Sequence, residues 1–302
     1  MKHNINFESY FKKFNIFSIA VFFLSIILIF FKGLNYGIDF KGGTLLEINL
    51  NNDKIKIGDI RNSLNKLNLG DVNVKNFGKD GYYLINIEKK FSNNQEIITN
   101  IKKSLNTDLQ SEINYRRIEN VGPKVSSELL RSGVISIVLA LLVMLVYIWF
   151  RFEWQFSLGS IIALFHDVII TLGFFSVLSI EINLSIVAAV LTIVGYSMND
   201  TVVIYDRIRE NLSKFNNLEI NKISNLSVNE TLSRTLITSI TTLLALLSIF
   251  ILGGEILKGF SFAMILGVLI GTYSSIFVAA PVLKYLKVSH KTLEKKEEKI
   301  VP

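Results

Sequence analysis

The chain has 302 residues, of which 50% are hydrophobic, and its formal net charge is +7. It contains no cysteine, which excludes disulfides and thiol chemistry. The apolar residues gather in six runs, each long enough to cross a bilayer, which takes about 20 residues. This concentration excludes an ordinary soluble globular protein and predicts a polytopic α-helical membrane protein.

The first predicted elements are a cytoplasmic N-terminus over residues 1–13 and a membrane span over residues 14–33. Lys12 and Lys13 precede the apolar run, as basic residues do in a signal peptide. A signal peptide, however, has an apolar region of about 7–15 residues and a small-residue cleavage site. This run is longer and ends at Phe30-Phe31-Lys32 without such a site, so we expect an uncleaved span.

Residues 34–132 are expected to form an α+β domain on the extracytoplasmic side. Alternating apolar residues predict four strands, and apolar stripes at helical spacing predict two helices between them. The resulting order, β-α-β-β-α-β, is the ferredoxin-like pattern. The predicted strands are Thr44–Asn51, Asp71–Phe77, Tyr82–Glu88 and Glu112–Val121, the stripes cover 57–67 and 97–109, and a turn is expected at Lys79–Gly81.

Two segments join this domain to the neighbouring spans: Gly37–Gly43 after the first span and Val121–Leu130 before the second. A tight turn explains the glycines of the first segment. The alternative is a hinge that lets the domain swing. The candidate hinge residues are Gly37, Gly42, Gly43, Gly122 and Pro123.

The remaining spans are predicted over residues 133–150, 157–180, 184–205, 234–252 and 261–283, with a cytoplasmic loop over 206–233 and a basic cytoplasmic tail over 284–302. Lysine and arginine are frequent in the N-terminus, this loop and the tail, and scarce in the short loops between the other ends of the spans. Both termini are therefore expected in the cytoplasm. The positive charge reflects this bias, so nucleic-acid binding is not expected; a basic tail beside a membrane suits anionic lipid or an acidic partner.

The last span carries a stripe of small residues at every fourth position: Ala263, Gly267, Gly271, Ser275 and Ala279. Small side chains on one helix face let another helix approach closely. We expect Gly267 and Gly271 to serve helix packing and no chemistry.

Ionisable residues inside the spans are the candidate functional residues. An isolated charge at mid-bilayer costs at least ~2.5–3.5 kcal/mol, so such residues face the bundle interior, find a partner or stay neutral. His166 and Asp167 lie in the third span, Asp200 lies in the cytoplasmic half of the fourth, and Arg234 lies at the start of the fifth.

The depth of Arg234 depends on where its helix begins. Ser227 and Glu230 form a capping-box pattern, which predicts a helix start near Val228. Arg234 would then lie roughly two turns into the helix and, in an antiparallel neighbour, near the depth of Asp200.

Two interpretations of these charges remain open. In the first, Asp200 and Arg234 form a structural ion pair that orients two spans. In the second, Asp200 binds a proton, and Arg234 controls the charge of Asp200 by moving away and returning. Asp167 can likewise be either structural or proton-binding. His166 and Asp167 point about 100° apart on a helix, so one of them can be a packing residue.

Several motifs resemble the SecF family of protein-export membrane proteins, and they occur in the order of that family over nearly the whole chain. They are GIDFKGGT after the first span, VGPKVSSELL before the second, ALFHD in the third, VGYSMNDTVVIYDRIREN in the fourth, SRT at residues 233–235 and GTYSSIFVAAP in the sixth. One departure is Met198, which stands where leucine is commoner in the family.

The resemblance implies a six-helix bundle of the RND transporter type in the bacterial cytoplasmic (inner) membrane. It also implies an accessory role in protein translocation rather than an enzyme. In the family, the chain pairs with SecD and assists the SecYEG channel and the SecA motor, with YajC as a further partner. It draws an exported unfolded polypeptide across the lipid bilayer with the proton or sodium gradient. The functional membrane charges of the family correspond to Asp200 and Arg234; no cofactor or metal is expected.

Two other functions fit parts of the sequence. A different RND-type transporter, exporting a small molecule or lipid, would need a partner, because such chains commonly carry two six-span repeats and this chain carries one. An intramembrane aspartyl protease would use Asp167 and Asp200 as a dyad. Its signature places the second aspartate in Gly-x-Gly-Asp, whereas residues 197–200 read Ser-Met-Asn-Asp, which argues against a protease.

Overall fold

The computed structural model describes residues 5–50, 55–78, 80–88, 94–111, 113–215 and 217–297. Within these ranges, six helices are long and apolar enough to cross a membrane, as the sequence predicts. The contacts between residues divide the chain into two compact units. The helical unit comprises Met1–Asn35, Ile135–Ile180 and Ser185–Pro302; the α+β unit comprises Tyr36–Val134 and Glu181–Leu184.

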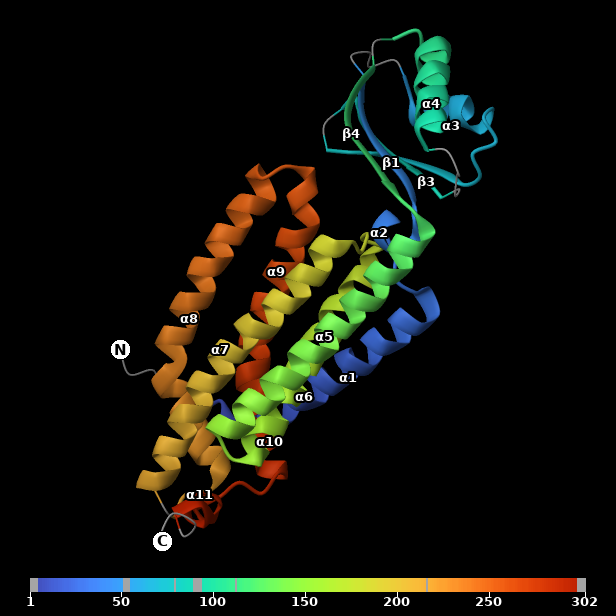
Figure 1. Ribbon diagram of the computed structural model, residues 1–302. Helices are drawn as coiled ribbons and strands as arrows, with labels where there is room; N and C mark the ends of the chain where they lie inside the picture. Colours follow the sequence, from blue (N-terminus) through green and yellow to red (C-terminus); the bar gives the residue numbers. More distant parts are fainter. Residues whose placement is uncertain are drawn as a thin grey trace. The chain divides into compact units, whose positions relative to one another are not determined.

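Each membrane helix overlaps one predicted span. Four of the helices contain their span completely, whereas α1 ends one residue and α6 two residues before the predicted end. They are α1 (Glu8–Lys32), α5 (Pro123–Arg151), α6 (Trp154–Leu178), α7 (Leu184–Lys214) and α8 (Ile220–Leu252), followed by a last span made of α9 (Glu255–Ser274), the π-helical turn η1 (Ser275–Ala279) and α10 (Ala280–Tyr285) (Figure 1). A short helix, α11 (His290–Glu297), follows. The extra length mixes charged residues with apolar ones, among them the exposed Val125, Trp154 and Ile256.

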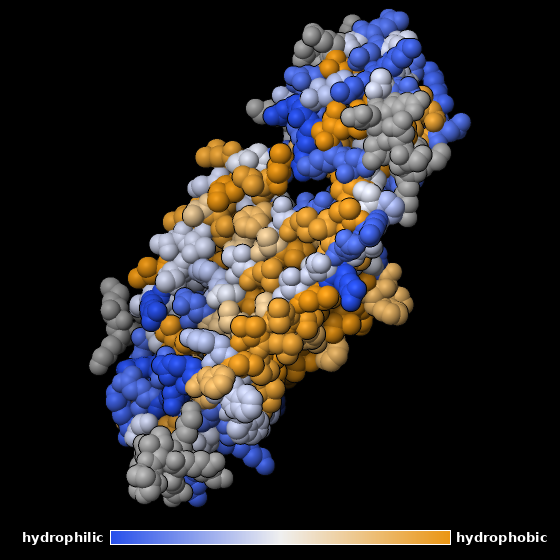
Figure 2. Space-filling view, in the orientation of Figure 1, coloured by the Kyte–Doolittle hydropathy of each residue, from blue (hydrophilic) through white to orange (hydrophobic). Residues whose placement is uncertain are grey.

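The helices differ in how much of their apolar surface they bury. In the most apolar stretch of each helix, 56% of the residues of α6 and of the last span are buried, against 11% for α1 and for α5. Figure 2 shows a broad hydrophobic surface over the helical unit and hydrophilic residues toward its α11 end. The exposed apolar side chains suit a lipid environment, while α6, α7 and the last span form the interior.

The last span changes its winding at η1. Pro281, near the start of α10, has no N–H to donate to a carbonyl one turn earlier. The Tyr205 hydroxyl of α7, which is fully buried, donates to the carbonyl oxygen of Ala279 at 3.0 Å. The π turn is therefore flanked by a proline and held by a hydrogen bond from a neighbouring helix.

The predicted cytoplasmic loop over residues 206–233 is mostly helical, and the predicted helix start near Val228 is wrong. Helix α7 continues to Lys214 and α8 begins at Ile220. Ser227 does not cap a helix; its Oγ accepts a hydrogen bond from Asn211 Nδ2 of α7 at 3.0 Å. The pairing of α7 with α8 thus uses the serine that the local pattern assigns to a cap.

The α+β unit contains a four-stranded antiparallel sheet in the order β2-β3-β1-β4. The strands are β1 (Gly43–Leu50), β2 (Val72–Asn76), β3 (Tyr82–Ile87) and β4 (Ile113–Val121); helices α3 (Ile57–Asn65) and α4 (Asn94–Leu109) lie on one face (Figure 1). A short helix, α2 (Ile38–Lys41), precedes β1. The element order β-α-β-β-α-β agrees with the prediction, while the predicted end residues Asn51 and Glu112, and Lys79 of the predicted turn, lie outside the described residues.

The core of this unit follows from the alternation of the strands. Leu46, Ile48 and Leu50 of β1 are at most 2% exposed and pack with buried residues of α3 and α4, among them Ile60 and Leu105. The opposite side of β1 carries Glu47, which pairs with Arg116 of β4 at 3.2 Å. One face of β1 therefore builds the core, and the other carries an ion pair.

Candidate functional site

Asp167 of α6 is fully buried and lies at the meeting point of three helices. Its Oδ2 accepts hydrogen bonds from Ser197 Oγ of α7 at 2.6 Å and from Ser274 Oγ of α9 at 2.7 Å. Its Oδ1 lies 2.9 Å from Nδ1 of His166. Three short hydrogen bonds satisfy this carboxylate in an interior that would otherwise make its burial costly.

Glycines bring α9 close enough to α7 for this arrangement. A Cβ added at Gly271 would lie 2.9 Å from Cβ and 3.2 Å from Cα of Ser197. A Cβ at Gly267 would meet side-chain atoms of Ile193 at 2.2 Å and above. The small residues of the last span thus pack against α7, next to the serine that contacts Asp167.

His166 connects this buried cluster to a groove. Its side chain is 7% exposed, and its Nε2 has no hydrogen-bond partner among the described residues. Because Nδ1 lies against the Asp167 carboxylate, an ionised Asp167 makes Nδ1 the donor and leaves Nε2 an acceptor in a neutral imidazole.

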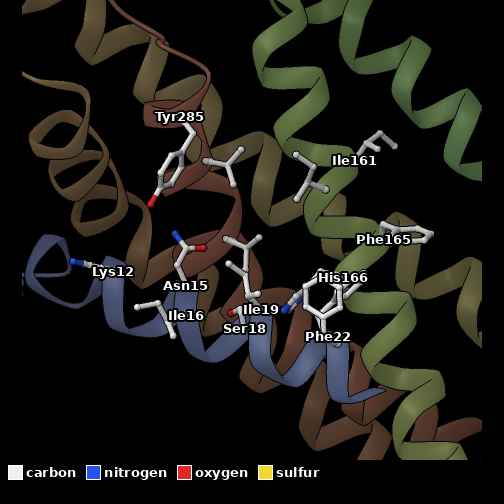
Figure 3. A pocket seen from close by; sticks show the side chains of 14 residues that line it. Lys12, Asn15, Ile16, Ser18, Ile19, Phe22, Ile161, Phe165, His166 and Tyr285 are labelled. Atoms are coloured by element: carbon white, nitrogen blue, oxygen red, sulfur yellow. The ribbon is translucent and has the colours of Figure 1, made fainter. Parts of the chain in front are cut away.

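The groove has a volume of about 670 Å³ and a mostly apolar lining. Figure 3 shows His166 and Phe22 at one end and Lys12, Asn15 and Tyr285 toward the other. The lining residues come from α1, α6, η1 and α10. A buried, unpartnered ring nitrogen at a groove is a position from which a proton can be exchanged.

Asp200 of α7 is also buried, with 3% exposure, but it is held differently. Within the described part of the chain, it accepts one long hydrogen bond, from Thr272 Oγ1 at 3.5 Å. Thr272 Oγ1 in turn lies 2.7 Å from Ser239 Oγ of α8. Few hydrogen-bond donors would therefore stabilise a negative charge on Asp200, whereas three donors contact Asp167.

Arg234 of α8 lies near enough to act electrostatically on Asp200, but no ion pair joins them within 4.0 Å among the described residues. The Arg234 side chain is exposed. Helices α7 and α8 are instead joined by the Tyr196 hydroxyl, which lies 3.1 Å from the Thr238 carbonyl oxygen and 3.2 Å from Thr242 Oγ1. In this conformation, the arginine neither orients the two helices nor neutralises the carboxylate by contact.

The charged end of α7 pairs with its neighbours. Arg207 binds Glu230 of α8 at 2.6 Å, and Asp206 accepts from Arg151 of α5 at 2.9 Å. Arg209 lies 3.1 Å from Glu153, whose side chain is 7% exposed. These contacts fix the ends of the helices that carry the buried aspartates.

The predicted hinge residues all lie within the α+β unit, and their surroundings differ. Gly42 and Gly43 have φ values of 78° and 125°, and a Cβ at Gly43 would lie 2.4 Å from the Ile87 carbonyl oxygen, so glycine is required there. A Cβ at Gly37 would lie 2.5 Å from Glu181 Oε1. At Gly122, just before Pro123, it would meet nothing within 4 Å. A hinge at these residues stays a prediction.

The hydroxyl partners of the two aspartates do not follow from the sequence motifs. Thr272 and Ser274 lie on a helix far along the chain from the aspartates to which they donate, and Ser239, which bonds Thr272, lies on α8. One signal does point to Thr272 and Ser274: the run Gly271–Ser275 places four hydroxyl residues in a row inside an apolar span.

Comparison with known proteins gives two matching family models. The model described as "Protein export membrane protein SecD/SecF, C-terminal" matches residues 101–289. The model "SecD/SecF GG Motif" matches residues 27–53, which contain the predicted Gly37–Gly43 segment.

Several similar proteins are named "Protein translocase subunit SecF". The one from Rickettsia rickettsii is 45% identical over 286 residues, covering 93% of this chain and 92% of the relative. The one from Rickettsia felis is 46% identical over 268 residues, covering 88% and 87%. The one from Rhodobacter capsulatus is 43% identical and covers 89% and 85%.

Among solved structures, the fold resembles the crystal structure of SecDF, described as a translocon-associated membrane protein, from Thermus thermophilus. The TM-score is 0.85 and the identity 33%, over 94% of this chain and 39% of that longer chain. A super-membrane-facing form of SecDF gives a TM-score of 0.71 at 32% identity, over 98% of this chain and 40% of that one. With the family model over residues 101–289 and relatives above 40% identity along most of their length, this chain belongs to the SecD/SecF family of protein export membrane proteins.

Proposed function

We propose that this chain is an accessory subunit of the Sec protein translocase that pairs with SecD and uses the transmembrane proton or sodium gradient to promote late steps of protein export. It lies in the bacterial inner membrane with both termini in the cytoplasm. Its partners are the SecYEG channel, the SecA motor, YajC and the exported unfolded polypeptide. The relatives named as SecF subunits and the likeness to SecDF support this role.

One observation carries the mechanism: Asp200 is buried in a membrane helix with one long hydrogen bond and without a contacting cation in the described part of the chain. A buried carboxylate in that state is stabilised by taking up a proton or by the approach of a positive charge. Arg234 is the nearby cation that can approach. Proton uptake by Asp200 would weaken the attraction between Arg234 and Asp200, and proton release from Asp200 would restore it.

Asp167 has a different part in this proposal. Its three hydrogen bonds hold α6, α7 and α9 together, so it keeps the interior in register while Asp200 changes charge. His166 is placed to exchange a proton between Asp167 and the groove. The two carboxylates have separate hydrogen-bond partners among the described residues, which is unlike a protease dyad.

The proposed movement begins between α7 and α8 and reaches the α+β unit through the segments at Gly37–Gly43 and Gly122–Pro123. A swing of that unit would draw the exported chain outward. Exported protein would thereby be moved at the expense of the ion gradient, with no catalytic group required in this subunit.

The test compares Asp200→Asn with Asp206→Asn in vesicles that contain SecD, the channel and the motor. Asp206 is a matched control because it lies on the same helix, beyond the apolar run, in an exposed pair with Arg151. Export is measured with the gradient intact and after an ionophore collapses it. We expect Asp200→Asn to abolish the gradient-dependent part of export and Asp206→Asn to preserve it.

Gradient-dependent export at the wild-type rate in Asp200→Asn would refute the mechanism. Purification of the native complex without a SecD partner would refute the pairing. Recovery of a homo-oligomer alone would instead favour a small-molecule or lipid transporter.

A further inference from the structure

The loop between α6 and α7 belongs to the α+β unit. Residues Glu181–Leu184 make their contacts with that unit, although α6 before them and α7 after them run through the helical unit. Leu184 is at once a residue of the α+β unit and the first residue of α7, the helix that carries Asp200. The α+β unit is therefore joined to the membrane helices at three places: to α1 and α5 through the two candidate hinge segments, and to α7 through this loop.

Two contacts fasten this loop to residues Tyr36–Asp39, and a third joins it to the sheet; the loop and Tyr36–Asp39 are together called the clasp. Tyr36 and Ile182 form a parallel β-bridge, and the Gly37 N–H donates to the Ile182 carbonyl oxygen at 2.9 Å. Ile182 is 5% exposed, so the bridge is shielded from water. The backbone contact gives the clasp a defined register.

Asp39 forms the second contact. Its Oδ2 accepts a hydrogen bond from the backbone N–H of Leu184 at 2.9 Å. The first N–H groups of a helix have no partner within the helix, and a carboxylate there is favoured by the helix dipole. A distant segment of the chain thus caps one N–H group at the start of α7.

The third contact reaches the sheet directly. Asn86 Nδ2 of β3 lies 3.4 Å from Glu181 Oε2. Glu181 also fills the space beside Gly37, where a Cβ would lie 2.5 Å from its Oε1. The loop is therefore connected both to the segment before β1 and to the strand beside β1.

The clasp lies on a short path between Asp200 and the sheet. Asp200 follows Leu184 by 16 residues, which corresponds to about 24 Å of continuous helix. On the other side, Asp39 lies in α2, and β1 begins at Gly43, directly after Gly42. β1 is an inner strand, bonded to β3 and β4.

We propose that Asp39 is a positioning residue of ion-driven export: it fastens the start of α7 to the segment that leads into β1, so that a displacement of α7 moves the sheet. This inference rests on the proposed function of Asp200. It changes the picture of Gly37, which becomes part of a fastened joint instead of a free hinge. The clasp stays closed while it transmits the movement.

The test uses the absence of cysteine from the natural chain. Tyr36→Cys with Ile182→Cys places two thiols on a β-bridge, where strands lie about 4.8 Å apart, within reach of a disulfide. The pair is introduced into the wild-type chain and into Asp39→Ala, each in the complete complex. Glu88→Ala is the matched control, because Glu88 is an exposed carboxylate of the same unit in a surface pair with Lys41.

We expect Asp39→Ala to lower gradient-dependent export by about tenfold, the typical effect of losing a hydrogen bond to a charged group, and Glu88→Ala to leave it unchanged. Oxidation of the cysteine pair should restore export in Asp39→Ala, and reduction should remove that rescue. A purely local loss of folding would not be rescued by one reversible bond. In the wild-type background, the oxidised pair should export normally, because the clasp works closed.

Normal gradient-dependent export in Asp39→Ala would overturn the proposal, as would a disulfide that forms without restoring export. Asp200→Asn, measured beside these variants, separates the two proposals. Loss of export in Asp200→Asn with normal export in Asp39→Ala overturns the clasp alone. Normal export in Asp200→Asn overturns the proposed function and, with it, the coupling through Asp39.

Discussion

Replacing Asp167 with alanine should destabilise the helical unit far more than the loss of an exposed carboxylate such as Asp206. The substitution removes a fully buried acceptor from three donors at once: His166, Ser197 and Ser274. The three donors come from α6, α7 and α9. The lost hydrogen bonds therefore lie at the centre of the bundle.

The size of the effect follows from what each donor can do afterwards. Ser274 Oγ lies 3.1 Å from the Gly271 carbonyl oxygen and can turn to it. His166 Nδ1 has no second acceptor in the described part of the chain. Hydrogen bonds to charged groups contribute about 1.5–3 kcal/mol each, and breaking a buried charged pair costs about 3–5 kcal/mol. With one donor re-satisfied, we expect Asp167→Ala to lower the free energy of unfolding by about 3–5 kcal/mol.

The assay is equilibrium unfolding of the full chain in mixed detergent micelles, with two companion variants. Asp167→Asn keeps one oxygen and most of the volume, so it should cost less than Asp167→Ala. Asp206→Ala removes a carboxylate that is 43% exposed in a surface pair, which typically contributes about 0–1 kcal/mol. An Asp167→Ala protein as stable as Asp206→Ala would refute the assignment of Asp167 as the structural centre.

Three further predictions concern packing, a buried hydroxyl and a surface carboxylate. Gly271→Ala should cost about 1–3 kcal/mol in the same unfolding assay, because the new Cβ meets Ser197. Gly195→Ala, where a Cβ has open space, should shift stability by less than about 1 kcal/mol; equal effects would contradict the packing account. Tyr205→Phe should cost about 0.5–1.5 kcal/mol through loss of the hydrogen bond to Ala279, and no loss would show that this bond is unimportant. Hydrogen bonds from Lys66 and Ser63 hold the pKa of Asp108 below its usual range. This contribution to stability is present above the pKa of the unfolded chain and is lost as pH falls through the lower folded pKa. An NMR titration of the Asp108 carboxyl should show the lowered pKa, and Lys66→Met should raise it; a value unmoved by that change would exclude Lys66 as the main cause.

Local patterns in the sequence were sufficient for the six membrane spans, the four strands and the two longer helices of the α+β unit, but not for α2, η1 or α11. Apolar run length located the membrane helices because a span must be apolar over a bilayer's thickness. Alternation located β1, where Leu46 and Ile48 enter the core and Glu47 does not. In both cases the signal comes from residues close together in the chain.

The prediction was wrong where a contact between helices outweighed a local pattern. Ser227 and Glu230 match a helix cap, yet both contact Asn211 of α7 in the middle of a continuous α8. A capping signal describes what a serine can do locally. It does not include a partner that arrives from another helix.

The different surroundings of the two buried aspartates could not be predicted for the same reason. Ser274 is 107 residues from Asp167, and Thr272 is 72 residues from Asp200. Sequence motifs join residues close together in the chain, so they do not reveal contacts at either of these separations. The clasp is similar: Asp39 and Leu184 are 145 residues apart, and nothing in the loop at Glu181–Leu184 identifies its partner.

The π turn in the last span has a consequence for how the stripe of small residues should be counted. In an α-helix four residues turn the chain by about 400°, so a stripe at every fourth position drifts by about 40° at each step. From Ala263 to Ala279 that drift would reach about 160° and carry the stripe to the far side of the helix. Both residues are nonetheless fully buried, as is Ser275 between them, and Gly271 is buried as well.

The wider turn at η1 winds each residue less and returns part of that rotation. The last span is therefore an α-helix whose winding changes once, at η1, just before Pro281. A π turn holds one residue more than an α turn for nearly the same rotation, so deleting one residue of η1 should restore α winding and keep Leu283, now fully buried, on the inner side. The first three steps of the stripe precede η1, so the burial from Ala263 to Ser275 shows a helix that is enclosed on more than one side, and η1 changes only the step to Ala279.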